Sequence, residues 1–504
     1  MVMQAIQGVL LDPVSLLLIF IGVVIGIIFG AIPGLSASMA LILFLPMSFG
    51  MDPMHGIVLL TGLYLGGISG GLISAILLQI PGTASSIATV FDGGPMAKQG
   101  RAGEAIGLGI LTSFVGGLIS IFALMFISPY LAKVTLAFTS AEYFSIALFA
   151  LTIISSLSGK SIMNGILAGL FGISLSLVGI APVDGAIRFT FGFSKLYGGF
   201  STVVILIGLY AVTDIIVTGF QRHHIINDET KYEYTMKGYG IPISEYVKHW
   251  GNIIRSALIG IGIGILPGIG GSTSSLLSYT AAKNASKHPE TFGKGEIDGL
   301  IASETANNAV IGGSLIPLIT RGIPGNVATA IFLGGLTIHG ISPGPLIFMK
   351  SGQYVYGIFI GLLVANVVML IVERAGIRWF VKLLDIPKYY LLPVVMVCCV
   401  VGSYCANFSV FDVYSVFVFG MVGLLFKKLK VPSTPMIIGF ILGDMTEENF
   451  RQALMQTGGS WSIFVTRPIS LIFLIIAVVS VVMTVRKQVN ERKAGKAAAE
   501  EEDE

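Results

Sequence analysis

Residues 22–44, GVVIGIIFGAIPGLSASMALILF, form an apolar segment of membrane type that is interrupted near its middle. Glycine recurs every fourth residue from Gly22 to Gly34, so one face of the predicted helix carries no side chains. Pro33 lacks an amide N–H, and we therefore expect the helix to break at this residue. A break also resolves a problem of length, because residues 14–46 as one straight helix would extend about 50 Å, beyond a hydrocarbon core of about 30 Å.

The composition indicates a membrane protein. The chain has 504 residues, of which 54% are hydrophobic and 11% are charged, whereas a soluble globular chain carries about 25% charged residues. About 20 apolar residues cross a bilayer, and the roughly dozen such stretches predict an all-α polytopic membrane protein with about 12 transmembrane helices. The N-terminal segment has no basic residue and no small-residue cleavage site, so we expect the first helix to be retained.

The second half of the chain repeats the pattern of the first. Residues 260–277, GIGIGILPGIGGSTSSLL, match the opening stretch in glycine spacing and in the Pro-Gly pair, and residues 68–82 align with residues 311–325 without a gap. Broken helices in corresponding places of two halves are typical of binding sites in secondary transporters. The predicted organisation is a first membrane repeat at 1–220, a hydrophilic cytoplasmic connector at 221–252, a second membrane repeat at 253–485 and a charged, disordered tail at 486–504.

Loop charges favour an inverted repeat, because Lys and Arg accumulate on the cytoplasmic side of a membrane. The loop after the second break carries Lys98 and Arg101, while its counterpart in the other half, GGLTIHGISPGP, carries neither residue type. Conversely, the loop after Pro33 has none, and its counterpart at 281–298 has three lysines. The basic tail after residue 485 favours the cytoplasm, as the connector at 221–252 does. Strict inversion would place these two regions on opposite sides of the membrane. Either residues 434–447 cross the membrane fully or one half contains an extra element.

Four Pro-Gly pairs interrupt apolar stretches, and small polar residues follow each pair. A half-helix that begins at such a break points unpaired N–H groups and a partial positive charge into the protein, which suits a carboxylate. Backbone carbonyls of the unwound segments could hold Na⁺ near the four glycines Gly34, Gly82, Gly268 and Gly325. The alternative is that Gly, Ser and Pro only allow close helix packing. The candidate substrate- or ion-binding residues at the breaks are Pro33, Gly34, Ser36, Ser38, Pro81, Gly82, Thr83, Ser85, Pro267, Gly268, Ser272, Thr273, Ser274, Pro324, Gly325 and Asn326.

Charged and amide side chains inside predicted spans are further candidates, because they are costly in a membrane and usually functional. Asn307 and Asn308 lie about one helical turn from Glu304, on the same face of the predicted helix. Arg321 lies just before the fourth break and could bind a carboxylate through two parallel hydrogen bonds; its matched position in the first half is Leu78. The alternative is a structural ion pair between Arg321 and Glu304. Four acids in plainer spans are expected to cap helices or to pair between them: Glu142, Asp214, Asp412 and Asp444.

Four long motifs of this chain resemble one known family. They are GAIPGLSASMALILFLP at 30–46, LLQIPGTASSIATVFDGGPMAKQGRAGEAIG at 77–107, GILPGIGGSTSSLLSYTAAK at 264–283 and FGKGEIDGLIASETANNAVIGGSLIPLITRGIPGN at 292–326. They are similar to the large membrane subunit of tripartite tricarboxylate transporters, the TctA family, and the resemblance covers essentially the whole chain. It implies a multi-pass permease of the bacterial inner membrane that is driven by an ion gradient. It also implies two partners, a small membrane subunit and a periplasmic solute-binding protein that delivers a carboxylate.

The resulting prediction is an ion-driven symporter and not an enzyme. The residues and the resemblance together predict a binding-protein-dependent secondary transporter that imports small carboxylates, either a citrate-like tricarboxylate or a dicarboxylate. The expected coupling ion is Na⁺ or H⁺, with no cofactor and no nucleic-acid partner. A membrane-embedded enzyme and an ion channel are the alternatives.

Overall fold

The computed structural model describes residues 1–33, 35–135, 138–157, 162–220, 240–267, 270–383, 388–482 and 486. Most of these residues are helical, and the only strands among them are the two-residue strands β1 (Gly179–Ile180) and β2 (Ile187–Arg188), which pair antiparallel. The predicted all-α class is therefore confirmed. The site candidates Gly34 and Gly268, most of the predicted connector and almost all of the predicted tail lie outside the described residues.

The described helices follow one another along the chain in this order. In the first half they are α1 (Val2–Leu10), α2 (Pro13–Ala31), α3 (Ala37–Ser48), α4 (Pro53–Ser69), α5 (Gly71–Leu77), η1 (Ala84–Ser86), α6 (Ile87–Met96), η2 (Ala97–Arg101), α7 (Ala102–Thr135), α8 (Ser140–Leu157), α9 (Ile162–Ser176), η3 (Ser194–Leu196), α10 (Thr202–Leu206), η4 (Ile207–Val212) and α11 (Thr213–Phe220). In the second half they are α13 (Ile243–Tyr246), η5 (Val247–His249), α14 (Trp250–Ile265), α15 (Gly270–Ala285), η6 (Pro289–Thr291), α16 (Ile297–Arg321), α17 (Val327–Ile338), α18 (Ile347–Lys350), α19 (Gly352–Leu383), α20 (Lys388–Asn407), α21 (Val410–Lys428), α22 (Ser433–Gln456) and α23 (Ile463–Thr466).

Within the described residues, five helical segments are long and apolar enough to cross a membrane. They are Pro13–Ala31, Pro53–Leu77, Ala84–Val134, Gly352–Phe380 and Val410–Lys428. Six shorter apolar helices of 10–17 residues accompany them, among them Pro468–Val482. These segments indicate a multi-pass membrane protein, while the number of about twelve spans and the internal duplication stay predictions.

All four predicted helix breaks fall between helices. Pro33 lies between α2 and α3, Pro81 between α5 and η1, Pro267 between α14 and α15, and Pro324 between α16 and α17. Proline supplies no N–H to the helical ladder and disfavours helical geometry in the residue before it, which explains why each helix ends there. The breaks predicted from these four prolines are therefore confirmed.

The chain forms two compact units. The larger unit comprises Met1–Leu136 and Val203–Leu424, and the smaller unit comprises Ala137–Thr202 and Leu425–Glu504. This division by contacts differs from the predicted division into two repeats, which remains a prediction about sequence duplication. All of the predicted binding residues that the structure describes belong to the larger unit.

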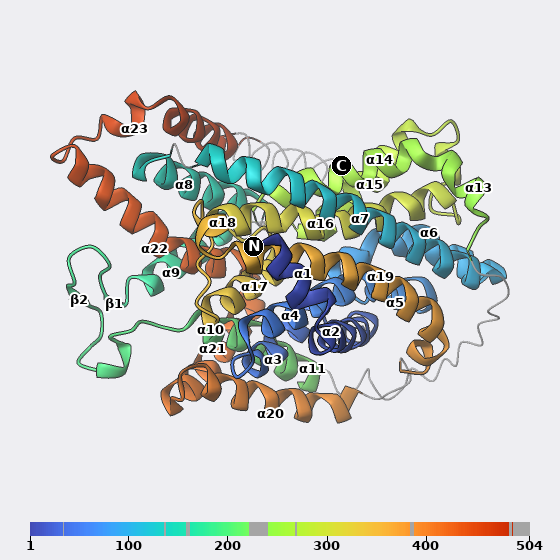
Figure 1. Cartoon of the computed structure of the whole chain (residues 1–504), viewed down its shortest axis with the longest axis horizontal. Coiled ribbons are helices and arrows are strands. Elements are labelled where there is room, and N and C mark those ends of the chain that lie inside the picture. Colours follow the sequence, from blue (N-terminus) through green and yellow to red (C-terminus); the bar gives the residue numbers. More distant parts are fainter. Residues whose placement is uncertain are drawn as a thin grey trace, which may run out of the picture. The chain divides into compact units, whose positions relative to one another are not determined.

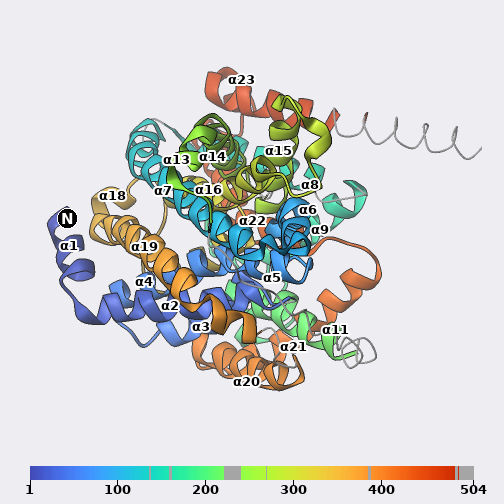
Figure 2. The ribbon, with the colours of Figure 1, turned by 90° about the vertical axis from the view of Figure 1, so that its right-hand side faces the viewer.

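Helix α16 is the central element of the larger unit. Every residue from Gly299 to Thr320 is buried, so neighbouring elements surround this helix on all sides. The helix packs along α7, α14 and α15, and its course beside α7 can be followed in Figure 1 and Figure 2. Helix α2 packs along α4, and α19 covers parts of α2, α4 and α7. The complete burial of Gly299–Thr320 means that any polar side chain on this stretch must find its partner inside the protein.

The smaller unit contains α8, α9 and α22 packed on one another. Glu142 at the start of α8 accepts a hydrogen bond from the Thr139 amide at 2.7 Å and one from Arg467 at 3.2 Å, which confirms its predicted capping and pairing role. A hydrogen bond from Arg451 holds the pKa of Asp184, in the turn between β1 and β2, below its ordinary value. These contacts tie loops to helices and are structural in character.

Candidate functional site

Glycines bring the helices of each predicted half into backbone contact. A Cβ atom added at Gly26 of α2 would lie 2.6 Å from the carbonyl oxygen of Leu63 in α4. A Cβ atom at Gly260 of α14 would lie 2.6 Å from the carbonyl oxygen of Ala306 in α16. Both separations are shorter than a Cβ atom tolerates, so both positions require glycine. The two contacts join positions that correspond in the predicted duplication, and they support it.

The breaks themselves repeat this correspondence. A Cβ atom at Gly325, in the fourth break, would lie 2.6 Å from the carbonyl oxygen of Gly264 at the end of α14. A Cβ atom at Gly82, in the second break, would contact the carbonyl oxygen of Gly30 at the end of α2. In each half, therefore, the second broken segment rests on the last turn of the first broken helix.

The second and third breaks meet each other. A Cβ atom at Gly271, in the first turn of α15, would lie 2.7 Å from the Cβ of Ser85 and 3.4 Å from Oδ1 of Asn307. Beside this contact, the hydroxyl of Thr83 hydrogen-bonds those of Ser85 and Ser86, each at 3.0 Å. The start of α15, the start of the η1–α6 segment and the middle of α16 thus converge. We call this convergence of Thr83, Ser85, Gly271 and Asn307 the junction.

Further predicted residues lie around the junction. Ser272 and Thr273 follow Gly271 in the first turn of α15 and are half-buried. Ser274 is buried, and its hydroxyl lies 3.5 Å from the carbonyl oxygen of Ala306. The structure therefore brings polar residues of the second break, the third break and α16 into one neighbourhood.

The buried amides of α16 are only partly satisfied. Asn307 donates from Nδ2 to the carbonyl oxygen of Ile68 at 3.5 Å, and Asn308 donates to that of Glu304 at 3.2 Å. Oδ1 of Asn307 and Oδ1 of Asn308 have no hydrogen-bond partner, although the two residues are 1% and 0% exposed. Buried polar atoms without a partner are rare in proteins and call for a ligand, an ion or a water molecule.

The fourth break has a different environment. Asn326 caps α17 by accepting from the Thr329 amide at 2.9 Å, and its Nδ2 donates to the hydroxyl of Tyr64 at 3.1 Å. The Tyr64 hydroxyl also lies 2.9 Å from that of Ser314. A one-turn extension of the gapless alignment pairs Tyr64 with Asn307. In the first half, the Tyr64 hydroxyl satisfies its polar neighbours. At the matched position in the second half, the Asn307 amide oxygen has no partner.

The first break contributes a helix cap. The Ser36 hydroxyl accepts a hydrogen bond from the Met39 amide at 3.1 Å, which satisfies one of the free N–H groups at the start of α3. Ser38 is half-buried in the first turn of α3. Helix α3 packs against α17 as α15 packs against η1. No hydrogen bond that the structure gives for Ser36 or Ser38 reaches the junction.

The predicted alternative of an ion pair between Arg321 and Glu304 is wrong. Both residues belong to the single helix α16, which runs through Pro317 to Arg321 without a break. Their separation of 17 positions corresponds to about 25 Å at 1.5 Å per residue. Glu304 instead accepts hydrogen bonds from the hydroxyls of Thr89 and Ser113, the latter at 3.0 Å.

Arg321 does not join the junction either. It is half-buried at the C-terminal end of α16, and Gly322 follows it with a φ of 70°. The 14 positions between Asn307 and Arg321 correspond to about 20 Å of helix, so one small carboxylate cannot contact both. A binding role of Arg321 therefore remains a prediction for the fourth break alone.

The sequence reasoning missed Glu373. This residue of α19 is fully buried, and its Oε2 accepts a hydrogen bond from the Ser69 hydroxyl at 3.1 Å. The available signal was an acid in an apolar stretch. The apolar stretch predicts a span at about 353–373 with this acid at its edge, whereas helix α19 continues to Leu383.

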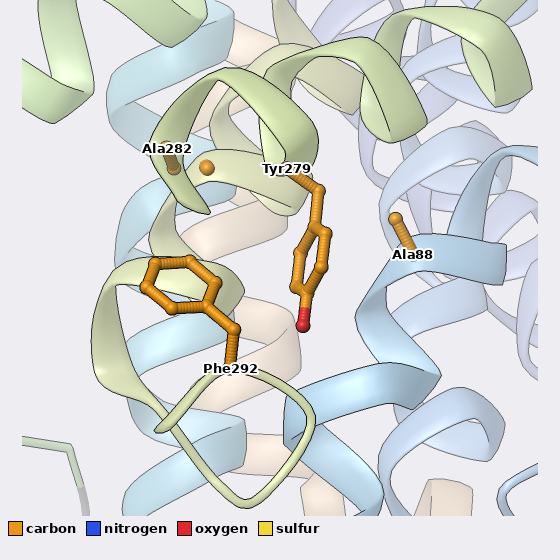
Figure 3. Close-up of a cluster of buried hydrophobic side chains, with 5 residues drawn as sticks. Ala88, Tyr279, Ala282 and Phe292 are labelled. Carbon is orange, nitrogen blue, oxygen red and sulfur yellow. The ribbon is translucent and has the colours of Figure 1, made fainter. Parts of the chain in front are cut away.

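Asp92 was also missed, and its role is structural. Its Oδ1 accepts hydrogen bonds from the backbone amides of Gly293, Gly295 and Glu296 at 2.8–2.9 Å. Beside it, Tyr279 and Phe292 pack edge to face with Ala88 opposite, as Figure 3 shows. Asp92 thereby fastens the segment before α16 to α6 and helps to fix the position of α16.

Comparison with known proteins gives the same family as the motifs. Residues 16–438 match the family described as "Tripartite tricarboxylate transporter TctA family". An Agrobacterium vitis protein, "Uncharacterized 52.8 kDa protein in TAR-I ttuC' 3'region", is 34% identical over 486 residues, which are 96% of this chain and 95% of that protein. A second one, "Uncharacterized protein in TAR-II ttuC' 3'region", is 34% identical over 231 residues, which are 46% of this chain and 96% of that protein. No solved structure matches the chain.

The family match covers most of the chain, and the family is one of transporters and not of enzymes. Its name implies partner subunits in general, and the apolar helices agree with a multi-pass membrane protein. The chain therefore belongs to the tripartite tricarboxylate transporter TctA family.

Proposed function

We propose that this chain is the large permease subunit of a binding-protein-dependent secondary transporter. It imports small carboxylates, a citrate-like tricarboxylate or a dicarboxylate, across the bacterial inner membrane by symport with Na⁺ or H⁺. Its partners in this proposal are a small membrane subunit and a periplasmic solute-binding protein. Membership in a tripartite family supports the existence of such partners.

The observation that carries the proposal is the difference between the two halves. On the Tyr64 side, the phenol hydroxyl satisfies Asn326 and Ser314. On the Asn307 side, the corresponding position is a shorter amide whose Oδ1 has no partner. A scaffold in which one half is satisfied and the other is not fits a protein that binds one ligand. The Asn307 oxygen only accepts hydrogen bonds, so a carboxylate at the junction would bind to the N–H groups and hydroxyls there.

The chemistry of the junction suits a carboxylate. Helix α15 and the η1–α6 segment both begin there, and the first turns of helices expose N–H groups and a partial positive charge. The hydroxyls of Thr83, Ser85 and Ser272 can add donors to a bound anion. Among the described residues, neither Lys nor Arg forms an ion pair at the junction, so the proposed site relies on neutral donors.

Transport by purified protein tests this proposal. The chain, with its small membrane subunit and its binding protein, is reconstituted into liposomes, and uptake of labelled citrate and of labelled dicarboxylates is measured. We expect saturable uptake that requires the binding protein and an inward Na⁺ or H⁺ gradient. Current that does not saturate would instead indicate a channel.

Matched variants of α15 then locate the site. Loss of one hydrogen bond to a charged group costs about 1.5–3 kcal/mol, so Ser272→Ala should raise the substrate KM about ten- to a hundredfold. Thr280 lies on the same helix with an exposed side chain that hydrogen-bonds its own backbone at Leu276, and Thr280→Ala is the control. An unchanged KM in Ser272→Ala and in Thr83→Ala would remove the junction from the binding site.

A further inference from the structure

Within the described part of the larger unit, two carboxylates lie in the interior without a basic side chain as partner. Glu304 of α16 and Glu373 of α19 are each 0% exposed. Asn307, about one helical turn from Glu304, donates to the carbonyl oxygen of Ile68, and the next residue, Ser69, hydrogen-bonds Glu373. Among the described residues, no Lys, Arg or His forms an ion pair with either one. Arg374 follows Glu373 but has an exposed side chain. A buried charge without a partner is costly, and it persists in membrane proteins mainly where it has a function.

The surroundings of the two acids supply oxygen atoms in excess of hydrogen-bond donors. The hydroxyls of Thr89 and Ser113 serve Glu304, and that of Ser69 serves one oxygen of Glu373. The following buried oxygen atoms have no hydrogen-bond partner: Oε1 of Glu373, Oδ1 of Asn307, Oδ1 of Asn308, Oδ1 of Asn366 and Oγ1 of Thr305.

The unsatisfied oxygen atoms determine which charge the missing ligand carries. A carboxylate oxygen and an amide oxygen only accept hydrogen bonds, so their missing partner is a donor or a cation. Reversal of an amide would exchange its oxygen for its nitrogen, but it would leave Oε1 of Glu373 unsatisfied. An anionic substrate is repelled by two nearby carboxylates. The pair therefore selects positive charge, and the carboxylate must bind elsewhere.

We propose that Glu304 and Glu373 form a binding site for one monovalent cation, either Na⁺ or H⁺, and that this is the coupling ion. The role of this cation in coupling rests on the proposed transport function, whereas the existence of the cation-binding site does not. Na⁺ would take oxygen ligands from both carboxylates and from nearby amides, whereas a proton would attach to one carboxylate oxygen and leave to the opposite compartment.

Asn307 connects this cation site with the junction. Its side chain lies beside the Glu304 carboxylate, and its Oδ1 also lies against Gly271 and Ser85 of the junction. It further reaches the backbone of Ile68, next to the Ser69 that serves Glu373. A cation on the acids and a carboxylate on the junction would thus be neighbours across one side chain, so that each favours binding of the other.

In the part of the chain that the structure describes, the groups that hydrogen-bond the two acids are uncharged. The elements that reach the acids are α4 with Ser69, α6 with Thr89, α7 with Ser113 and α19 with Met369 next to Ser69. Among the described residues these hydrogen-bond contacts are uncharged, and Glu304 is the charged group that acts on Glu373. Occupation of the pair by one cation therefore removes the repulsion between them.

Cation binding to the purified full-length chain without any carboxylate tests the inference. Equilibrium binding of radioactive Na⁺ is measured, and infrared spectra recorded between pH 5 and 9 without Na⁺ report the C=O stretch of a protonated carboxyl group. We expect one of the two signals in the wild type. Glu304→Gln and Glu373→Gln should each weaken Na⁺ binding at least tenfold or abolish the protonated-carboxyl signal.

Glu142→Gln is the matched control, because Glu142 is also buried but pairs with Arg467 in the smaller unit; it should retain the wild-type signal. If a Gln variant does not fold, Ser113→Ala takes its place and should shift cation affinity at least threefold. The inference is overturned if the wild type gives neither signal, or if the signal is unchanged in the folded variants.

Transport separates this inference from the proposed function. Accumulation of labelled carboxylate driven by the cation gradient should fall at least tenfold in Glu304→Gln and Glu373→Gln, whereas Glu142→Gln should accumulate carboxylate at the wild-type rate. A wild type that binds the cation but transports no carboxylate would contradict the proposed function alone. A wild type that transports carboxylate but binds no cation at these acids would contradict the cation site alone.

Discussion

Gly260 and Gly262 of α14 offer a sharp test of the packing that positions α16. A Cβ atom at Gly260 would lie 2.6 Å from the carbonyl oxygen of Ala306 and 2.6 Å from the Cβ of Ala309. A Cβ atom at Gly262 would meet nothing within 4 Å. Alanine improves helix propensity by about 1 kcal/mol at both positions, and this gain cancels in the comparison. Overpacking at Gly260 alone costs about 1–3 kcal/mol.

We therefore expect Gly260→Ala to be less stable than Gly262→Ala by about 1–3 kcal/mol. The assay is the fraction of folded protein as a function of sodium dodecyl sulfate in mixed micelles, with both variants and the wild type measured together. Gly26→Ala, with its Cβ 2.6 Å from the Leu63 oxygen, should match Gly260→Ala. A Gly260→Ala protein as stable as Gly262→Ala would refute the close approach of α14 to α16.

Three further outcomes are expected. Asp92→Ala removes the acceptor of three backbone amides, and each amide that water does not reach costs about 1–3 kcal/mol of folding stability. The segment around Lys294 should then open more often, so trypsin should cut after Lys294 faster than in the wild type. Arg321→Lys should keep the carboxylate KM within twofold of wild type if the substrate binds at Asn307, whereas a tenfold rise would move the site to the fourth break. Hydrogen bonds from His55 and Ser15 lower the pKa of Asp12 from 3.8 to about 2. The ionised carboxylate therefore stabilises the folded protein at pH 7, and Asp12→Asn should lower the melting temperature there. The difference in melting temperature between the wild type and Asp12→Asn should disappear as the pH falls from about 4 to 2.

Proline and glycine made the local structure predictable. Each of the four breaks has a proline followed directly by a glycine, two residues that disfavour helix, so the breaks at Pro33, Pro81, Pro267 and Pro324 were indicated by the local sequence. The spacing of glycines likewise indicated faces without side chains, and the contact of Gly260 with α16 shows what such a face packs against. The amides of α16 were found from the same reasoning about polar residues in spans.

Contacts between distant segments were not predictable in the same way. The hydrogen bond between Ser69 and Glu373 joins residues 304 positions apart, and no local pattern specifies it. The alternative that Arg321 pairs with Glu304 is wrong because α16 continues through Pro317, where the chain would have had to fold back for the two side chains to meet. Proline interrupts a helix only when the surrounding packing does not hold the helix together, which a single sequence does not reveal.

The central claim, that a carboxylate binds at the junction, is tested most directly by protection of a cysteine there. In a chain whose three native cysteines are replaced by serine, Ser272→Cys is labelled with a maleimide in the presence and absence of citrate or a transported dicarboxylate. Thr280→Cys, on the exposed face of the same helix, is the control. We expect the carboxylate to slow labelling at position 272 at least fivefold, with half-maximal protection at the transport KM, and to leave labelling at position 280 unchanged. Equal labelling rates at position 272 with and without a saturating, transported carboxylate would contradict it.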